Sequence, residues 1–79
     1  MTIEQQIERA SKPQVGDAYA GGKYGANRSA RVVLVGADYV RCFSMPTGVE
    51  FDTPATDWSR ICANTIRNGA TFTPAEVPQ

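Results

Sequence analysis

The stretch RVVLVGADYVRCF, residues 31–43, decides the fold that the sequence predicts. Two runs rich in β-branched and aromatic residues, 31–35 and 39–43, lie on either side of a three-residue connection at 36–38. Such runs are typical of strands, and a short connection with glycine and aspartate joins neighbouring antiparallel strands. The stretch therefore predicts a β-hairpin.

The two faces of this hairpin differ in chemistry. Side chains alternate across a strand, so Val40 and Cys42 share one face while Tyr39, Arg41 and Phe43 share the other. If the first pair points into the core, the other three form an exposed stripe. That stripe is either covered by an N-terminal helix or available to a partner.

The N-terminal segment predicts a short helix. Thr2 and Gln5 have the spacing of a capping box, and the residue before Pro13 is disfavoured in a helix, so the helix ends near residue 12. Its apolar face carries Ile3, Ile7 and Ala10.

Further strands are predicted on both sides of the hairpin. Residues 15–19 form a first strand, and a loop with three glycines follows at 20–28. The turn at 46–48 leads into a strand at 49–52, and a last strand covers 70–72.

Residues 55–69 allow two interpretations. The first is an amphipathic helix over 57–68, capped by Asp57 and ended by Asn68 and Gly69. Its apolar stripe would be Trp58, Ile61, Cys62, Thr65 and Ile66. The second is a strand at 58–61 and a helical turn at 63–65. Poor helix formers such as Asn64 and Asn68 favour the second interpretation narrowly.

The order of these features resembles that of the SH3-like small β-barrels of short bacterial and bacteriophage proteins. The resemblance covers residues 13–73, the opening VGDAY strand and the hairpin included. It implies a mainly β fold: a five-stranded barrel at 13–73, preceded by the helix at 1–12, with a helical turn before the last strand and a flexible tail at 74–79. The alternative is an α+β fold, a three- or four-stranded antiparallel sheet with a helix at 57–68.

The same resemblance implies a place for binding. In that family the loop after the first strand and the turn after the third frame a groove, which would involve Tyr19, Tyr24 and the loop at 20–29. Peptide-binding SH3 domains also carry an acidic cluster in that loop. This sequence has none there, so a proline-rich peptide is not the expected ligand.

Several chemistries are excluded or disfavoured. The sequence has no histidine, which excludes histidine-dependent triads and dyads. Its aspartates are spread one per turn or strand end, so no metal site is expected, and GGKYGANRSA (residues 21–30) has the spacing of neither phosphate-binding glycine motif. Cys42 and Cys62 are twenty positions apart and are expected to be buried thiols. We expect no cofactor and no enzymatic activity.

Charge indicates the kind of partner. Eight basic and eight acidic residues cancel, which disfavours general nucleic-acid binding. Residues 18–41 nevertheless carry four cations against one acid, a local excess of +3. The candidate partner-binding residues are Lys23, Tyr24, Arg28, Arg31, Tyr39 and Arg41. Trp58 is interpreted first as a packing residue and second as an exposed anchor.

These observations predict a non-enzymatic binding module that occupies a surface on a larger protein. The resemblance extends this to a bacteriophage accessory protein that modulates a host factor. Two alternatives stay open: a weak, salt-dependent oligonucleotide-binding barrel, and a self-associating structural subunit. With no long apolar stretch and no signal-like N-terminus, we expect a cytoplasmic protein that does not bind membranes.

Overall fold

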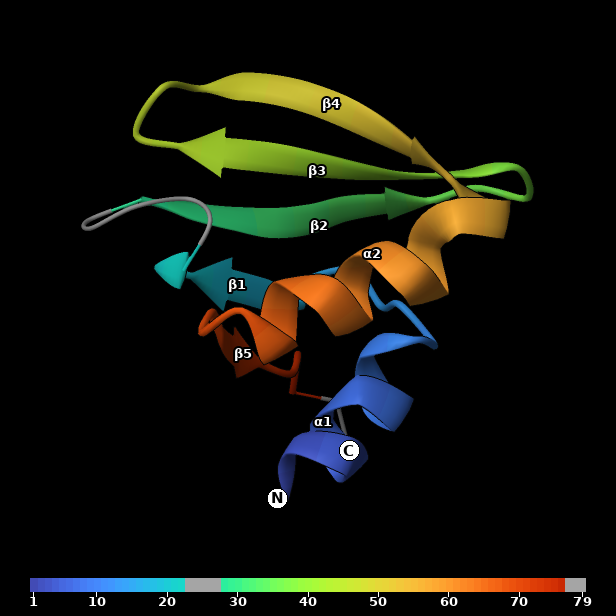
Figure 1. The fold of residues 1–79 in the computed structure, drawn as a ribbon. Helices are drawn as coiled ribbons and strands as arrows, with labels where there is room; N and C mark the ends of the chain where they lie inside the picture. The colour runs from blue at the N-terminus through green and yellow to red at the C-terminus, as the bar shows by residue number, and fades with distance from the viewer. Residues whose placement is uncertain (23–27, 77–79) are drawn as a thin grey trace.

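The computed structural model describes residues 1–22 and 28–76 (Figure 1). The elements in chain order are α1 (Ile3–Ala10), β1 (Ala18–Ala20), β2 (Ser29–Val35), β3 (Tyr39–Met45), β4 (Val49–Pro54), α2 (Ala55–Arg67) and β5 (Thr71–Thr73). The strands form one antiparallel sheet in the order β4-β3-β2-β1-β5. Five antiparallel strands, an N-terminal helix and a helix before the last strand are thus confirmed.

The sheet is open, so the expected barrel does not form in the described part of the chain. β4 and β5 lie at its two edges. Helix α2 runs diagonally across one face of the sheet, from the end of β4 towards β5 (Figure 1). The apolar face of the sheet is buried against this helix, which removes the need for the sheet to close on itself.

The hairpin at the centre of the sheet is confirmed. Arg31 pairs with Phe43 and Val35 with Val40, and the register shifts at a bulge between Val32 and Leu34. The next turn is also where the sequence predicted it, since the amide of Gly48 donates to the carbonyl of Ser44 at 2.8 Å. The first strand begins later than predicted, at Ala18.

Residues 55–67 form a single helix, so the narrow preference for a strand at 58–61 is wrong. A helix of thirteen residues is about 20 Å long. The centres of the outer strands in a five-stranded sheet are about 19 Å apart. The helix thus has the length needed to connect the β4 edge of the sheet with the β5 edge.

The buried side of α2 is the stripe that the helical interpretation predicted. Trp58, Cys62, Thr65 and Ile66 are buried. The hydroxyl of Thr65 donates to the carbonyl of Ile61 at 2.8 Å, so this weak helix former is accommodated without an unsatisfied polar group. The predicted cap is wrong: the helix begins at Ala55, and Asp57 lies in its first turn, where its charge favours the helix dipole.

The core lies between the sheet and α2. Its buried members are Ala10, Tyr19, Val32, Val40, Cys42, Trp58, Cys62, Ile66 and Phe72. The ring of Tyr19 is 6.1 Å from that of Trp58 and 5.1 Å from that of Phe72. Trp58 is 5% exposed, and its indole nitrogen donates to the Ala10 carbonyl at 2.8 Å. Its interpretation as a packing residue is confirmed.

Helix α1 packs against α2, on the same side of the sheet as α2 (Figure 1). Its capping box between Thr2 and Gln5 is present as predicted. Ala10 is buried and Ile7 packs against the core. Because α1 lies here, it does not cover the stripe of Tyr39, Arg41 and Phe43, and that alternative is wrong.

Asp17 joins three parts of the chain. Its side chain is fully buried and accepts two hydrogen bonds from the Arg9 guanidinium, at 2.8 and 3.0 Å. It also accepts from the backbone amides of Gln14 at 3.0 Å and Ala75 at 2.8 Å. A carboxylate with this many donors can stay charged inside a protein, and it fixes α1 to the start of β1.

Candidate functional site

The face of the sheet opposite α2, here called the outer face, brings together most of the described residues that the sequence predicted as a site. Val40 and Cys42 are buried towards α2, so their strand neighbours lie on the other side. Directly opposite residues of neighbouring strands share a face. The register therefore assigns to the outer face Ala18, Arg31, Tyr39, Arg41, Phe43, Glu50 and Asp52.

Arg41 is held in one orientation on this face. Its Nε donates to Oδ1 of Asp52 at 2.8 Å and its Nη2 donates to Oδ2 at 3.2 Å. The guanidinium carbon lies 5.4 Å from the ring centre of Tyr39. A two-bond pair combined with an aromatic contact restricts the side chain more than a single ion pair does.

This pair also shifts two ionisation equilibria. The hydrogen bonds with Asp52 raise the pKa of Arg41, and the same bonds hold the pKa of Asp52 below its ordinary value. A lowered carboxyl pKa stabilises the fold above the unfolded pKa, and the benefit is lost as the pH falls through the folded value. Both groups face solvent, so the pair contributes little stability, and its main effect is to orient Arg41.

A second row crosses the outer face beside the first. Arg31 on β2 lies opposite Phe43 on β3, which lies opposite Glu50 on β4. Arg31 is exposed and Phe43 is half-buried. The two rows together carry two arginines and two acids, so their charges cancel while the rings of Tyr39 and Phe43 remain.

The predicted site residues do not all meet on this face. Arg31, Tyr39 and Arg41 do, and Arg28 is exposed just before β2 begins. Lys23 and Tyr24 lie outside the described residues. Tyr19, which the family resemblance placed in a groove, is instead buried in the core at 2% exposure, because β1 is a central strand with its inner face under α2.

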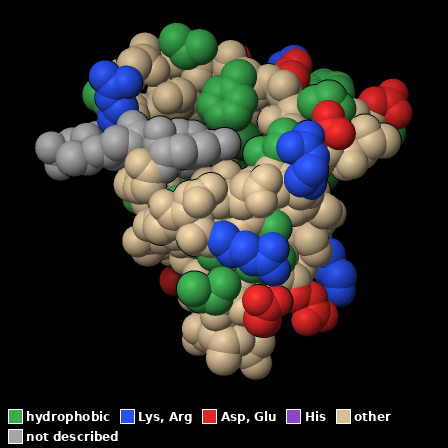
Figure 2. Space-filling view, viewed as in Figure 1, with side chains coloured by type: hydrophobic (Ala, Val, Ile, Leu, Met, Phe, Trp, Pro, Cys, Tyr) green, Lys and Arg blue, Asp and Glu red, His purple; other side chains and the backbone are tan. Residues whose placement is uncertain are grey.

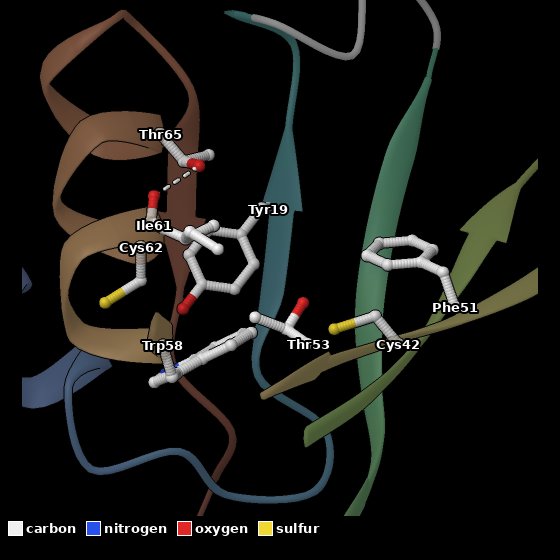
Figure 3. Close-up of a pocket in the computed structure, with 8 residues that line it drawn as sticks. All are labelled: Tyr19, Cys42, Phe51, Thr53, Trp58, Ile61, Cys62 and Thr65. Carbon is white, nitrogen blue, oxygen red and sulfur yellow. Dashed lines mark hydrogen bonds between the residues drawn. The ribbon is translucent and has the colours of Figure 1, made fainter. Parts of the chain in front are cut away.

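A cavity lies on the other side of the sheet, between its inner face and α2 (Figure 3). Its volume is about 220 Å³. The lining residues are Tyr19, Cys42, Phe51, Thr53, Trp58, Ile61, Cys62 and Thr65. The sequence did not predict this cavity. The signal that was present is the alternation of Val49 and Phe51 with Glu50 and Asp52, which gives β4 one apolar side.

The chemistry of the cavity does not indicate a nucleophile at Cys62. Burial raises the pKa of the Cys62 thiol, which keeps it in the less reactive protonated form near neutral pH. Its Sγ lies 3.4 Å from the carbonyl of Ser59 and donates to it. Cys42 and Cys62 are both buried thiols, as expected from the sequence.

Among residues 1–22 and 28–76, no group of three or more cysteine, aspartate or glutamate side chains is arranged to hold a metal ion. In the same residues, no helix has the length and apolar character needed to cross a membrane.

No protein-family model, no curated protein and no solved structure matches the chain. The resemblance to SH3-like small barrels therefore rests on the order of the elements, and the open sheet departs from it. The function has to be inferred from the residues of the chain itself.

Proposed function

We propose that the protein is a small non-enzymatic binding module that docks on another protein through its outer face. The observation that carries the proposal is the position of α1 on α2. Within the described residues, this position leaves the outer face without a covering layer. A face of a sheet that carries aromatic rings and is not covered is typical of an interaction surface.

The composition of the outer face supports a protein partner over a nucleic acid. Tyrosine, phenylalanine and arginine are enriched where proteins meet, and here Tyr39, Phe43 and Arg41 come from one strand of a rigid sheet. A phosphate-binding surface needs an excess of cations. Among the described residues of this face, Asp52 and Glu50 offset Arg41 and Arg31, and these four show no excess of cations.

The size of the face indicates a transient complex. Five strands are about 19 Å across, and the longest strands, of seven residues, are about 24 Å long, so the flat area is at most roughly 450 Å². A stable interface of standard size buries about 800 Å² per partner. Binding through this face alone therefore belongs to the weaker, reversible class.

A finer form of the proposal makes the partner a host factor and the protein a cytoplasmic bacteriophage accessory protein. The support for this form is the similarity of the element order to small barrels of that kind. The capture experiment that follows tests it, because the identity of a captured bacterial protein would decide it.

The test is affinity capture from a bacterial lysate with three proteins, each compared by quantitative mass spectrometry. The site variant combines Arg31→Glu with Phe43→Ser. The control is Arg60→Glu, the same charge reversal at an arginine on α2 that is 66% exposed. We expect a bacterial protein that the wild type and the control retain and the site variant loses. Equal recovery by all three, with thermal unfolding showing all three folded, would contradict the proposal.

A gel-shift series separates the oligonucleotide alternative. We expect no retardation of single- or double-stranded probes even at low salt, where phosphate contacts are strongest. If a probe is retarded and Arg31→Glu abolishes the retardation, the outer face binds nucleic acid and the proposal of a protein partner is contradicted.

A further inference from the structure

The strand β4 is an edge of the sheet with two chemically different sides. Within the described residues it pairs with β3 alone. An edge strand directs alternate N–H and C=O groups away from the sheet, where another strand can bind them. The other edge strand, β5, has three residues, whereas β4 has six. Of the two edges, β4 therefore offers the longer row of backbone groups for pairing with another strand.

One side of β4 is apolar and exposed. Phe51 lies opposite the buried Cys42, so it belongs to the inner face, and Val49 shares that face. Val49 is 58% exposed and Phe51 is 37% exposed. Figure 2 shows hydrophobic side chains at the surface above α2, in the region where Figure 1 places β4. The diagonal path of α2 leaves this corner of the inner face uncovered.

The cavity lies directly behind this corner. Phe51 lines it from β4 and Ile61 lines it from α2 (Figure 3). Its volume of about 220 Å³ is below the roughly 300 Å³ at which pockets for drug-sized ligands begin. A cavity of about 150 Å³ accepts a benzene ring. The space therefore suits one apolar side chain better than a cofactor.

The other side of β4 is acidic. Glu50 and Asp52 alternate with Val49 and Phe51 and lie on the outer face. A strand that added to β4 would place alternate side chains beside these acids and the remaining ones beside the apolar corner. Asp52 already holds Arg41 through two hydrogen bonds, so Glu50 carries the charge complementarity. It favours a basic residue beside Glu50 and apolar residues at the alternate positions.

We propose that β4 and α2 form a groove that binds an extended segment of another protein by strand addition. The bound segment alternates basic and apolar residues. Its backbone pairs with β4, a basic side chain lies beside Glu50, and one apolar side chain enters the space between Phe51 and Ile61. The apolar side of this groove lies on the inner face, and its acidic side borders the docking surface on the outer face.

A second copy of the chain does not fit the same groove. If two β4 strands paired antiparallel, residues on the same face would lie opposite each other in every register that preserves the faces. The two such registers that pair the most residues place Glu50 opposite Asp52, or Asp52 opposite Asp52. Like charges directly opposite are destabilising, so β4 selects a basic partner over itself.

Fluorescence anisotropy with four labelled eight-residue peptides tests the proposal. The probe is the alternating peptide KVKLKVKV. The first control, KKKKVVLV, has the same composition in blocks. The second control is the probe with N-methyl groups on alternate residues, in two versions that block one backbone edge or the other. Strand addition uses the backbone hydrogen bonds of one edge of the peptide. We therefore expect the version that is N-methylated on the edge facing β4 to bind about tenfold or more weakly than the probe, and the other version to bind like the probe.

Two charge-reversed proteins locate the site. Glu50→Lys changes an exposed acid on β4, and Glu8→Lys makes the same change at an exposed position on α1. We expect the first to weaken binding of the probe about tenfold and the second to leave it nearly unchanged. Amide shifts in an NMR titration should be largest at residues 49–54 and 58–65.

Several outcomes would overturn the proposal. These are no binding of the probe, equal binding of the block peptide or of both N-methyl versions, and equal weakening by both charge reversals. A dimer that forms through β4, detected by sedimentation over a concentration range, would also overturn it. Phe51→Ser changes the inner face alone, so it should weaken binding of the probe and leave capture through the outer face unchanged. Failure of the groove and failure of the outer face are thus distinguishable.

Discussion

At the scale of single residues, a buried carboxylate and an exposed one show how differently two aspartates act in this fold. Asp17 is fully buried with four hydrogen-bond donors, whereas Asp52 faces solvent beside Arg41. Both accept two bonds from a guanidinium, so their chemistry is the same. Burial alone makes the loss of one far more costly than the loss of the other.

Replacing Asp17 by asparagine should destabilise the protein strongly. The substitution puts an NH₂ group among the donors of Arg9, Gln14 and Ala75 and leaves the half-buried Arg9 guanidinium without its counter-charge. We expect the free energy of unfolding to fall by about 3–5 kcal/mol, a large share of the roughly 4–10 kcal/mol expected for a chain of this size. Urea denaturation followed by circular dichroism measures it.

The matched control is Asp52→Asn, which removes the charge of the exposed pair. Its denaturation midpoint should move much less than that of Asp17→Asn at neutral pH. Because the pKa of Asp52 is lowered in the folded state, any difference between this variant and the wild type should disappear as the pH falls through that lowered value. Equal midpoint shifts for the two variants would show that the burial of Asp17 has no special role.

At the scale of elements, α1 depends on its contacts with the rest of the fold. A helix of eight residues is not stable by itself in water. It is attached by the bond from Trp58 to the Ala10 carbonyl, by the pair of Arg9 with Asp17, and by the packing of Ile7. Each of these contacts comes from the half of the helix nearer its C-terminal end. The N-terminal turn has its capping box and an exposed ion pair between Glu4 and Arg67 of α2, at 3.6 Å.

Replacing Trp58 by phenylalanine should loosen α1 before it loosens the sheet. The variant keeps an aromatic ring but leaves the buried Ala10 carbonyl without its donor, at a cost of about 1–3 kcal/mol. Hydrogen exchange followed by NMR measures the opening of α1 at the amides of Gln6 and Ser11, which donate to carbonyls within α1 and at its N-terminal end. We expect their exchange to accelerate more than that of amides in β3. Equal acceleration in both elements would mean that the bond supports the whole fold and not α1 in particular.

The elements that the sequence predicted well are those with local signals. The hairpin has two β-branched runs and a short connection, and α1 has a capping box and a proline beyond its end. The sequence allows two interpretations of the segment that forms α2, because Asn64, Thr65 and Asn68 disfavour a helix locally. The burial of Trp58, Cys62 and Ile66 against the sheet outweighs that preference, and this burial depends on the path of the chain between the two edges.

The two candidate surfaces also differ in how far they could be predicted from the sequence. Alternation within β3 was enough to place Tyr39, Arg41 and Phe43 on one face. The groove beside β4 was not predictable, since it exists because α2 crosses the sheet diagonally and leaves Val49 and Phe51 exposed. The pair of Arg9 and Asp17 was also missed, because it depends on where α1 docks.

At the scale of the whole molecule, the two thiols report on how completely the sheet and α2 stay together. Cys42 comes from the sheet and Cys62 from α2, and each is 2% exposed. Both line the same cavity (Figure 3). A bulky thiol reagent reaches them when the two layers separate.

Labelling by an aromatic disulfide such as dithiobis(nitrobenzoate) should therefore follow unfolding. In native buffer we expect labelling at least about a thousandfold slower than in urea, in line with unfolded fractions of 10⁻³ or less. The raised pKa of Cys62 acts in the same direction, since less thiolate is present at a given pH, and its labelling rate should rise as the pH increases. Rapid labelling of either thiol in native buffer would instead reveal local opening of the cavity.

The position of Asp17 also sets an order of events during synthesis of the chain. One of its four donors is the amide of Ala75, which follows it by 58 residues. Until that amide has left the ribosome, the carboxylate has fewer donors, and the segment that precedes β1 cannot reach its final state. Full anchoring of the segment between α1 and β1 thus follows the synthesis of β5, which precedes Ala75 in the chain.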